Sequence, residues 1–267
     1  MIELITRRLK DEMTDEERLN VSREFIQLLC LKILDEAGAF KNMVFTGGTA
    51  LRIVFGLRRF SEDLDFSVYK KGGKTFSEIN EKLVKEIRLA GLDVSSRLKT
   101  DKTVHSSMLK FPGILKEVLP GRHGKQNLSV KVETDTNPPA GGTVQSRFIH
   151  DVFIFNVVHF DLPSMFATKL HACFYRGFTK GRDFYDLIWY MSKKVKPNLV
   201  LFNNAVKQTE GKSPAISEEN FREFLIEKIE GVDFKNARRD VERFLEDKKE
   251  LRLFDVDLIR QSIESVY

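Results

Sequence analysis

The spacing of hydrophobic positions changes character once along the chain, near residue 160. Before this point, helical spacing predicts helices over residues 14–37 and 76–90, and Thr14 and Glu17 form a capping box at the start of the first. Apolar runs and the alternation of apolar and polar residues predict strands at 43–46, 64–68 and within 103–133. Beyond it, helices are predicted over residues 163–176, 181–193, 217–230, 236–249 and 255–264. We therefore expect an α/β (α+β) domain with a mixed sheet at residues 1–160 and an all-α domain at 161–267.

One segment of the first domain places charges where a strand normally has none. In FTGGTALRIVFGLRRFSEDLDFSV, residues 45–68, Asp63 and Asp65 interrupt an apolar strand and, because side chains alternate, lie on one face of it. Two neighbouring carboxylates repel unless a cation lies between them, and hard oxygen ligands of this kind suit Mg²⁺ or Mn²⁺. Upstream, Gly47, Gly48 and Thr49 open a short helix whose first backbone N–H groups can hold an anion. A metal ion and a triphosphate are expected to meet between this turn and the strand.

A third carboxylate is expected from a neighbouring strand. In LSVKVETD, residues 128–135, Val130 and Val132 are expected to face the core, which leaves Lys131, Glu133 and Asp135 on the opposite face. Glu133 is then the first choice for a third metal ligand. Asp135 is the second choice, because the turn begins there.

Four short blocks occur in order between residues 47 and 187. They are GGTALR (47–52), RFSEDLDF (59–66), KLHACFYR (169–176) and RDFYDL (182–187). Together they resemble the motifs of the AbiEii/AbiGii toxin family of the nucleotidyltransferase superfamily. The resemblance implies a minimal nucleotidyltransferase core like that of polymerase β, followed by a helical region that contributes lysine and aspartate motifs to the active site.

Helical spacing agrees with a role for the two later blocks. Lys169 and Arg176 are seven positions apart and are expected on one side of a helix, while Asp183 and Asp186, three apart, share a side of the next helix. A lysine there can neutralise charge on a triphosphate, and the aspartates could orient it or position the acceptor. The resemblance implies that Lys169 and one of the two aspartates are essential to catalysis, with the choice between Asp183 and Asp186 open. The expected nucleotide-binding residues are Gly47, Gly48, Thr49, Arg59, Ser61 and Lys169.

The function implied by the resemblance is a metal-dependent nucleotidyltransferase that moves a nucleoside monophosphate from an NTP to an acceptor. The protein would be the toxin of a bacterial toxin–antitoxin or abortive-infection system, with a cognate antitoxin protein as partner and the acceptor end of tRNA as target. Two alternatives stay open: transfer to a protein hydroxyl, and a non-catalytic module that binds nucleotide or RNA. An intact acidic pair argues against the second, since binding alone needs no such metal site.

The composition of the chain indicates which partners and which cellular compartment to expect. The chain has 44 Lys+Arg against 39 Asp+Glu, a net charge of +5 that is compatible with a polyanionic partner. Lys70, Lys71 and Lys74 form a basic loop that could contact the acceptor; this loop is not a P-loop, because Val68 stands where that motif needs glycine. Two distant cysteines argue against structural zinc and a disulfide framework. No apolar run is long enough to cross a membrane, and no signal-peptide core is present, so we expect a cytoplasmic protein.

Overall fold

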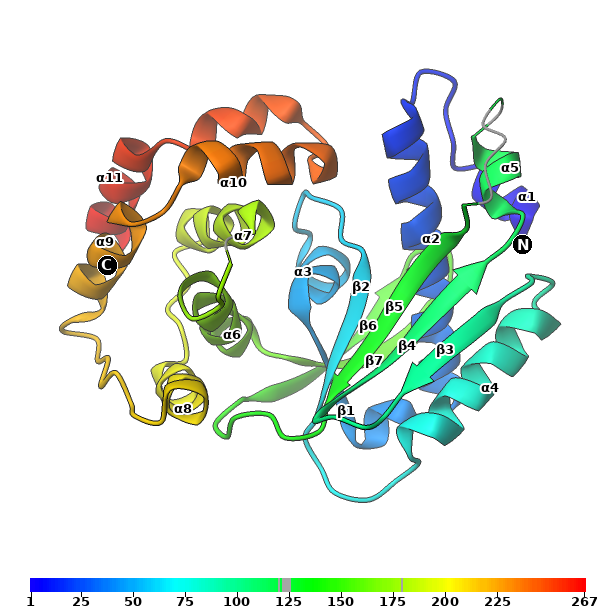
Figure 1. The fold of residues 1–267 in the computed structure, drawn as a ribbon, viewed down its shortest axis with the longest axis horizontal. Coiled ribbons are helices and arrows are strands. Elements are labelled where there is room, and N and C mark those ends of the chain that lie inside the picture. Colours follow the sequence, from blue (N-terminus) through cyan, green and yellow to red (C-terminus); the bar gives the residue numbers. More distant parts are fainter. Residues whose placement is uncertain (120, 122–125, 179) are drawn as a thin grey trace. The chain divides into compact units, whose positions relative to one another are not determined.

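The computed structural model describes residues 1–119, 121, 126–178 and 180–267, and the chain forms two compact units (Figure 1). Unit 1 comprises Met1–Phe55, Phe60–Pro138 and Gln145–His159, and unit 2 comprises Gly56–Arg59, Pro139–Val144 and Phe160–Tyr267. Two short segments from the N-terminal part thus belong with the C-terminal helices, so no single cut in the chain separates the units. The independent domains expected at 1–160 and 161–267 stay a prediction.

Unit 1 is built on a mixed sheet that has seven strands in the described residues, in the order β3-β4-β5-β2-β1-β7-β6. β2 is antiparallel to β1 and parallel to β5, β1 is parallel to β7, and β4 is antiparallel to both β5 and β3. This mixed sheet confirms the expected fold class. The strands are β1 (Met43–Thr46), β2 (Asp63–Val68), β3 (Ser95–Lys99), β4 (Val104–Phe111), β5 (Leu128–Asp135), β6 (Val144–His150) and β7 (Ile154–Phe160).

Helices α2 and α4 cover one face of this sheet, and α2 is seen behind the strands in Figure 1. Helix α2 packs against α4 and β5, and α4 also packs against β3. The predicted capping box is present at the start of α2, where the Glu17 carboxylate accepts a hydrogen bond from the Thr14 backbone N–H at 2.7 Å. The helices of unit 1 are α1 (Ile2–Thr6), α2 (Asp15–Glu36), η1 (Ala39–Lys41), α3 (Gly47–Phe55), α4 (Phe76–Leu89) and α5 (Ile114–Val118).

The strand alternation decides which side chains lie beneath these helices. On β5, Leu128, Val130 and Val132 are at most 1% exposed, whereas Lys131 and Glu133 between and beyond them are partly exposed on the opposite face. The buried set packs with the residues aligned to it on β4. The polar set lies on the face opposite α2 and α4, which is where the candidate site forms.

Unit 2 is helical around an aromatic core, as its sequence predicts. The rings of Phe166 and Tyr190 stack with centroids 4.3 Å apart, and Phe202 and Phe224 pack beside them at 5.5 Å from each other. Its first helix begins where the Asp161 carboxylate accepts a hydrogen bond from Ser164 N. The helices are α6 (Leu162–Phe174), α7 (Gly181–Ser192), α8 (Leu199–Glu210), α9 (Phe221–Glu230), α10 (Phe234–Val241), η2 (Glu242–Phe244), η3 (Lys248–Leu253) and α11 (Val256–Val266).

Several elements were not predicted from the sequence. Helix α8 contains Asn203 and Asn204, which are poor helix formers; in the fold their amides donate to the backbone oxygens of Ile216 and Ala140. Strand β3 is exposed along its whole length and so shows no alternation. The single helix expected at 236–249 is α10 followed by two short 3₁₀ segments, and α5 interrupts the stretch expected to be β between 103 and 133, of which residues 120 and 122–125 lie outside the described residues.

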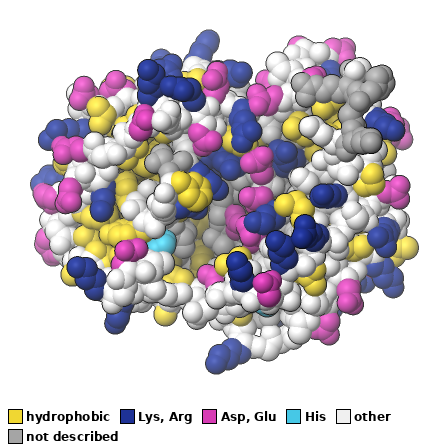
Figure 2. Space-filling model, in the orientation of Figure 1, with side chains coloured by type: hydrophobic (Ala, Val, Ile, Leu, Met, Phe, Trp, Pro, Cys, Tyr) yellow, Lys and Arg dark blue, Asp and Glu magenta, His cyan; other side chains and the backbone are white. Residues whose placement is uncertain are grey.

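The surface agrees with the modest positive charge of the chain. Figure 2 shows Lys/Arg and Asp/Glu side chains intermixed over the visible face. In the described part of the chain, no helix is both long enough and apolar enough to cross a bilayer.

Candidate active site

The glycine turn of unit 1 lies directly against the acidic strand. β1 ends at Thr46 and α3 begins at Gly47, with no loop between them. Gly47 has φ +77°, and a Cβ at this position would overlap the Asp65 carboxylate. Glycine is therefore required both by the left-handed backbone and by the close approach of Asp65. The structure thus brings together the turn and one of the two predicted aspartates.

Thr49 ties this turn to the start of the acidic strand. Its side chain is fully buried, and its hydroxyl donates a hydrogen bond to the backbone oxygen of Asp63. The Thr49 hydroxyl therefore stabilises the fold by joining α3 to the start of β2. The backbone N–H groups of Gly48 and Thr49, in the first turn of α3, are the groups that suit a phosphate.

The register of β2 against β5 sets the geometry of the carboxylates. These strands are parallel, and the aligned pairs include Asp63 with Lys131 and Asp65 with Glu133. Aligned residues of neighbouring strands point to the same face at a strand spacing of about 4.8 Å, so the two aspartates and Glu133 share the face opposite α2 and α4. Asp135 lies farther along, and its carboxylate accepts a hydrogen bond from Asn137 N in the following turn. This geometry favours Glu133 over Asp135 as the third ligand.

A lysine lies among these carboxylates, on the face that the alternation of side chains along the strand predicts for it. Lys131 Nζ is 2.7 Å from Glu133 Oε1. Partial burial alone would lower the pKa of Lys131, but Glu133, Asp63 and Asp65 outweigh burial and raise this pKa. Lys131 therefore supplies a positive charge to the acidic face. Its position two residues before Glu133 on a strand was the signal that could have revealed this role.

The residues on this face fit a divalent cation that arrives with its substrate. Within the described ranges, no three His, Cys, Asp or Glu side chains gather closely enough to hold a metal ion by themselves. The donors are nevertheless all carboxylate oxygens, and the Lys131 ammonium beside them shows that a positive charge is accommodated here. Mg²⁺ is commonly held by one or two carboxylates and completed by substrate phosphates and water. Asp63, Asp65 and Glu133 suit that form of binding.

Two further nucleotide-binding candidates, Arg59 and Ser61, have partners within the fold. Arg59, in unit 2, is only 2% exposed, and its Nε and Nη2 each lie 2.6 Å from a different carboxylate oxygen of Asp186. Such a two-point ion pair makes Arg59 a residue that positions Asp186 rather than one that presents its guanidinium to a ligand. The backbone oxygen of Ser61 accepts a hydrogen bond from the Gln27 amide at 3.0 Å, which holds this part of the motif against α2.

The lysine and aspartates of the two later motifs meet inside unit 2. Lys169 Nζ, on α6, lies 2.8 Å from Asp183 Oδ1 and 2.8 Å from Asp186 Oδ2, both on α7. The two aspartates thus share one side of their helix, as their spacing predicts. Arg176 lies beyond the end of α6, so the predicted helical placement of this residue is wrong; its Nη1 still reaches Asp183 Oδ2 at 2.8 Å.

This group is compact, buried and charged. Asp186 is 0% exposed and Asp183 5%, and three cations against two carboxylates leave one positive charge in excess. Burial alone would lower the pKa of Lys169, but Asp183 and Asp186 outweigh it and raise this pKa, so the ammonium stays charged at neutral pH. Asp183 and Asp186 both hold Lys169, and only Asp186 is completely enclosed. Asp186 is therefore suited to positioning Lys169 and has no surface to offer a substrate.

Asp183 makes the stability of unit 2 depend on pH. Burial alone would raise the pKa of Asp183, but Lys169 and Arg176 outweigh it and lower this pKa below its ordinary value of 3.8. A carboxyl whose pKa is lower in the folded protein stabilises the fold above its unfolded pKa, and this contribution is lost as the pH falls towards the folded-state value. We expect Asp183→Asn to be less stable than the wild type at pH 7 and to lose less stability between about pH 5 and pH 2. Urea denaturation at several pH values measures both effects, and equal pH dependence in the two proteins would contradict the assignment.

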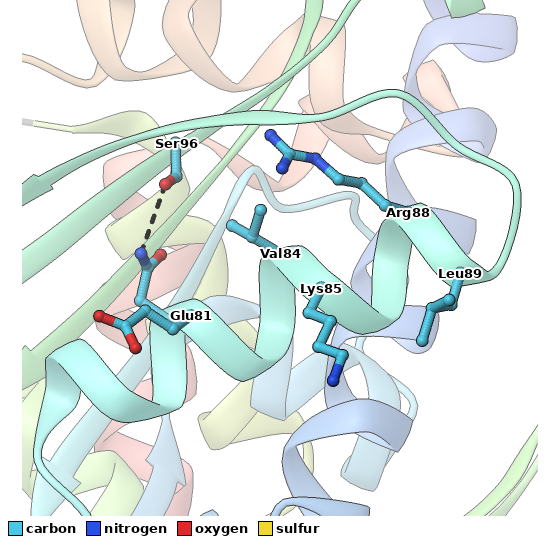
Figure 3. Close-up of a pocket in the computed structure, with 7 residues that line it drawn as sticks. Glu81, Val84, Lys85, Arg88, Leu89 and Ser96 are labelled. Atoms are coloured by element: carbon cyan, nitrogen blue, oxygen red, sulfur yellow. Dashed lines mark hydrogen bonds between the residues drawn. The ribbon is translucent and has the colours of Figure 1, made fainter.

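A hollow of about 500 Å³ on unit 1, between α4 and β3, contains none of the motif residues (Figure 3). A hydrogen bond of 3.3 Å from Asn80 Nδ2 to Ser96 Oγ crosses it. Arg88 donates a hydrogen bond to the backbone oxygen of Val94 at 2.9 Å. This bond joins the last turn of α4 to the residue that precedes β3. The hollow is thus bounded by residues that hold this edge of the sheet together.

Comparison with known proteins places this geometry in a family. The sequence model of the nucleotidyl transferase AbiEii toxin of type IV toxin–antitoxin systems matches residues 29–260. A search of curated proteins found no match. A crystal structure described as a nucleotidyltransferase from H. pylori is similar to this chain over 97% of its length and 99% of that chain, with 22% identity and a TM-score of 0.50. JHP933 from Helicobacter pylori shows 20% identity over 92% of this chain and 94% of that chain, with a TM-score of 0.49, which is too low to add to the argument.

The crystal structure of higher similarity supports the fold, and the family match covers all of the third and fourth sequence blocks as well as the acidic strand. Membership also brings a partner, since a type IV toxin is paired with an antitoxin. The chain belongs to the AbiEii family and is a nucleotidyltransferase toxin of the type IV toxin–antitoxin class.

Proposed function

We propose that the protein transfers a nucleoside monophosphate from an NTP to the acceptor end of a tRNA in the cytoplasm, with Mg²⁺ or Mn²⁺ as cofactor. One arrangement carries this proposal: Asp63 and Asp65 share one face of β2, beside the Gly47 turn and next to Glu133 of β5. In the reaction, the acceptor hydroxyl oxygen bonds to the α-phosphorus of the NTP, the bond to pyrophosphate breaks, and the hydroxyl proton leaves to solvent.

The residues of unit 1 bind and orient the substrate. Asp63, Asp65 and Glu133 would hold the metal, which when bound neutralises the leaving group and activates the acceptor oxygen. The first N–H groups of α3, at Gly48 and Thr49, would bind the phosphates. The close approach of Gly47 to Asp65 keeps the phosphate-binding turn and the metal-binding strand in one fixed geometry.

The charged group of unit 2 supplies a preorganised cation. We propose that Lys169 neutralises the charge that builds on the triphosphate during transfer, as cationic groups do in phosphoryl chemistry. Its two carboxylate partners hold the ammonium in place, and Arg59 in turn holds Asp186. Arg59 thus acts by positioning other residues in this proposal, and Lys169 acts on the substrate.

Labelling identifies both the acceptor and the nucleotide. The purified protein is incubated with each of the four α-labelled NTPs, with tRNA or total protein, and with or without Mg²⁺. We expect label in tRNA, with one NTP preferred, only when the metal is present. Label in protein alone would overturn the RNA acceptor and leave the transfer chemistry standing, whereas no label in any sample would overturn the proposed reaction.

Lys131→Met tests the metal site without measuring activity. Removing the ammonium takes the positive charge of Lys131 away from Glu133, Asp63 and Asp65, so a divalent cation should bind more tightly. A unit charge about 4 Å away is worth several kcal/mol at the effective dielectric of a protein surface, so an increase in Mn²⁺ affinity of at least about tenfold is expected. The affinity is measured by titrating Mn²⁺ into the nucleotide-free protein and following the EPR signal of the unbound Mn²⁺.

Lys110→Met is the matched control for this experiment. Lys110 lies on β4 opposite Ser129 of β5. Ser129 is two positions before Lys131 on β5, so Lys110 and Lys131 lie on the same face of the sheet. The Lys110→Met substitution removes the same charge at a greater distance from the carboxylates, so its effect on Mn²⁺ affinity should be small. Equal affinities in the Lys131→Met and Lys110→Met proteins would mean that the carboxylates near Lys131 do not bind the metal.

A further inference from the structure

The segment between α6 and α7 presents an aromatic ring flanked by two cations. Phe178 is 60% exposed, which is unusual for so large an apolar side chain. Arg176 Cζ lies 5.3 Å from the centroid of its ring and Lys180 Nζ lies 5.5 Å from it. These two cations come from positions two residues before and two residues after Phe178 in the chain.

Two cation–ring contacts elsewhere in the protein are of a different kind. Arg52 lies 4.0 Å from the Phe60 centroid and Arg182 lies 4.2 Å from that of Phe244, and both rings are buried. In those contacts the guanidinium covers the ring as part of the packing. Around Phe178 the cations stand more than 1 Å farther away and the ring stays open to solvent, so a planar ligand can approach it.

The Phe178 ring is linked to the charged group of unit 2 through Arg176. The guanidinium of Arg176 donates to Asp183 at 2.8 Å, and Asp183 in turn accepts from Lys169 at 2.8 Å. One side chain therefore connects the exposed ring to the lysine that we propose to act on the triphosphate. A ligand stacked on Phe178 would lie close to that group.

The charges around the neighbouring aromatic pair are mixed. The rings of His171 and Tyr175 stack 5.7 Å apart, but Glu210 and Glu227 lie close enough to act on Tyr175. Lys228 Nζ also lies 5.3 Å from the centroid of the Tyr175 ring, so this pair has charges of both signs around it and is less suited to a polyanion than the Phe178 ring. Two carboxylates lie near the Phe178 platform in the described residues: Asp183, which is paired with Lys169 and Arg176, and Asp240, which accepts a hydrogen bond from Gly181 N at 2.8 Å.

We propose that Phe178, Arg176 and Lys180 form a nucleobase-stacking platform for the RNA acceptor. An aromatic ring binds any base through its π face, and cations beside it bind the backbone phosphates. A nucleotide within an RNA strand has a phosphate on each side of it along the strand, and the platform has two cations near its ring, Arg176 and Lys180. A free NTP has phosphates on one side only. The platform rests on the proposed RNA acceptor and adds to it the residues that hold the base.

RNA binding without NTP tests this platform. Fluorescence anisotropy with labelled tRNA is measured for the wild type, Phe178→Ala and Phe178→Trp, with Phe148→Ala as control. Phe148 is 77% exposed on β6 of unit 1, so its removal is a matched loss of exposed aromatic surface. Because base stacking contributes about 1–3 kcal/mol, Phe178→Ala should bind tRNA about 5- to 150-fold more weakly, while Phe178→Trp retains affinity and Phe148→Ala is unchanged.

The salt dependence separates the roles of the ring and the cations. Lys180→Gln should lower the slope of log affinity against log salt by about 0.7, the value for one phosphate contact with a single strand, and Phe178→Ala should leave the slope unchanged. Unaltered tRNA affinity in Phe178→Ala, with the wild type still labelling tRNA, would overturn the platform and leave the proposed function intact. A loss of NTP affinity in place of tRNA affinity would also overturn it. A wild-type protein that neither binds nor labels RNA would overturn the RNA acceptor itself.

Discussion

Asp63→Asn and Asp65→Asn are each expected to lower the rate of nucleotide transfer by at least about a thousandfold. The two carboxylates lie on one face of β2, with Glu133 aligned to Asp65 on the adjacent strand. Metal ions typically contribute several kcal/mol to the stabilisation of charge in a transition state, and about 4 kcal/mol corresponds to a factor of a thousand. Asparagine keeps the shape of the side chain but removes its negative charge, so the loss should appear in the chemical step.

The fold should tolerate these changes. Both aspartates are only partly buried, and each belongs to a cluster in which carboxylates repel one another, so the free energy of unfolding should change by about 1 kcal/mol or less. Single-turnover transfer assays and thermal denaturation measure the two effects separately. Wild-type rates in both variants would show that the metal site has been placed wrongly.

Asp135→Asn is the control that tests the choice of third ligand. Asp135 lies on the same face of β5 as Glu133, but its carboxylate accepts a hydrogen bond from the turn that follows. Asparagine can still accept this bond, so Asp135→Asn should transfer at nearly the wild-type rate, whereas Glu133→Gln should be strongly impaired. The reverse order would make Asp135 the third ligand.

Asp186→Ala is expected to cause the largest loss of stability. It would leave the guanidinium of Arg59, which is 2% exposed, without its two-point partner and would remove one of the two carboxylates that hold Lys169. Removing one member of a buried ion pair costs about 3–5 kcal/mol, because the remaining charge stays buried. In a unit of this size the melting temperature should fall by about 6–20 °C.

Glu218→Ala is the matched control, because it breaks an ion pair of similar length on the surface. Glu218 and Lys196 are 3.0 Å apart, with side chains 72% and 71% exposed. Exposed pairs contribute at most about 1 kcal/mol, so this variant should unfold almost as the wild type does. If Asp186→Ala and Glu218→Ala shifted the melting temperature equally, the charged group would not stabilise unit 2.

Local features of the chain were predicted from the sequence because their causes are local. The alternation of side chains along a strand put Asp63 and Asp65 on one face, and the capping box fixed the start of α2, whatever the rest of the chain does. The glycine at position 47 was also recognised from its turn. Its full reason, the approach of the Asp65 carboxylate, became visible only when β1 and β2 were paired.

The sequence by itself determined the class of fold, the acidic strand and the family, whereas the tertiary structure decided which side chains meet. Arg59 is the clearest case, since its place in a motif predicted nucleotide binding, but its partner Asp186 is 127 positions away. Lys131 was predicted on the correct face, yet its place among the carboxylates depends on the register of β5 against β2. Local periodicity determines the direction in which a side chain points, and the packing of distant segments determines what it finds there.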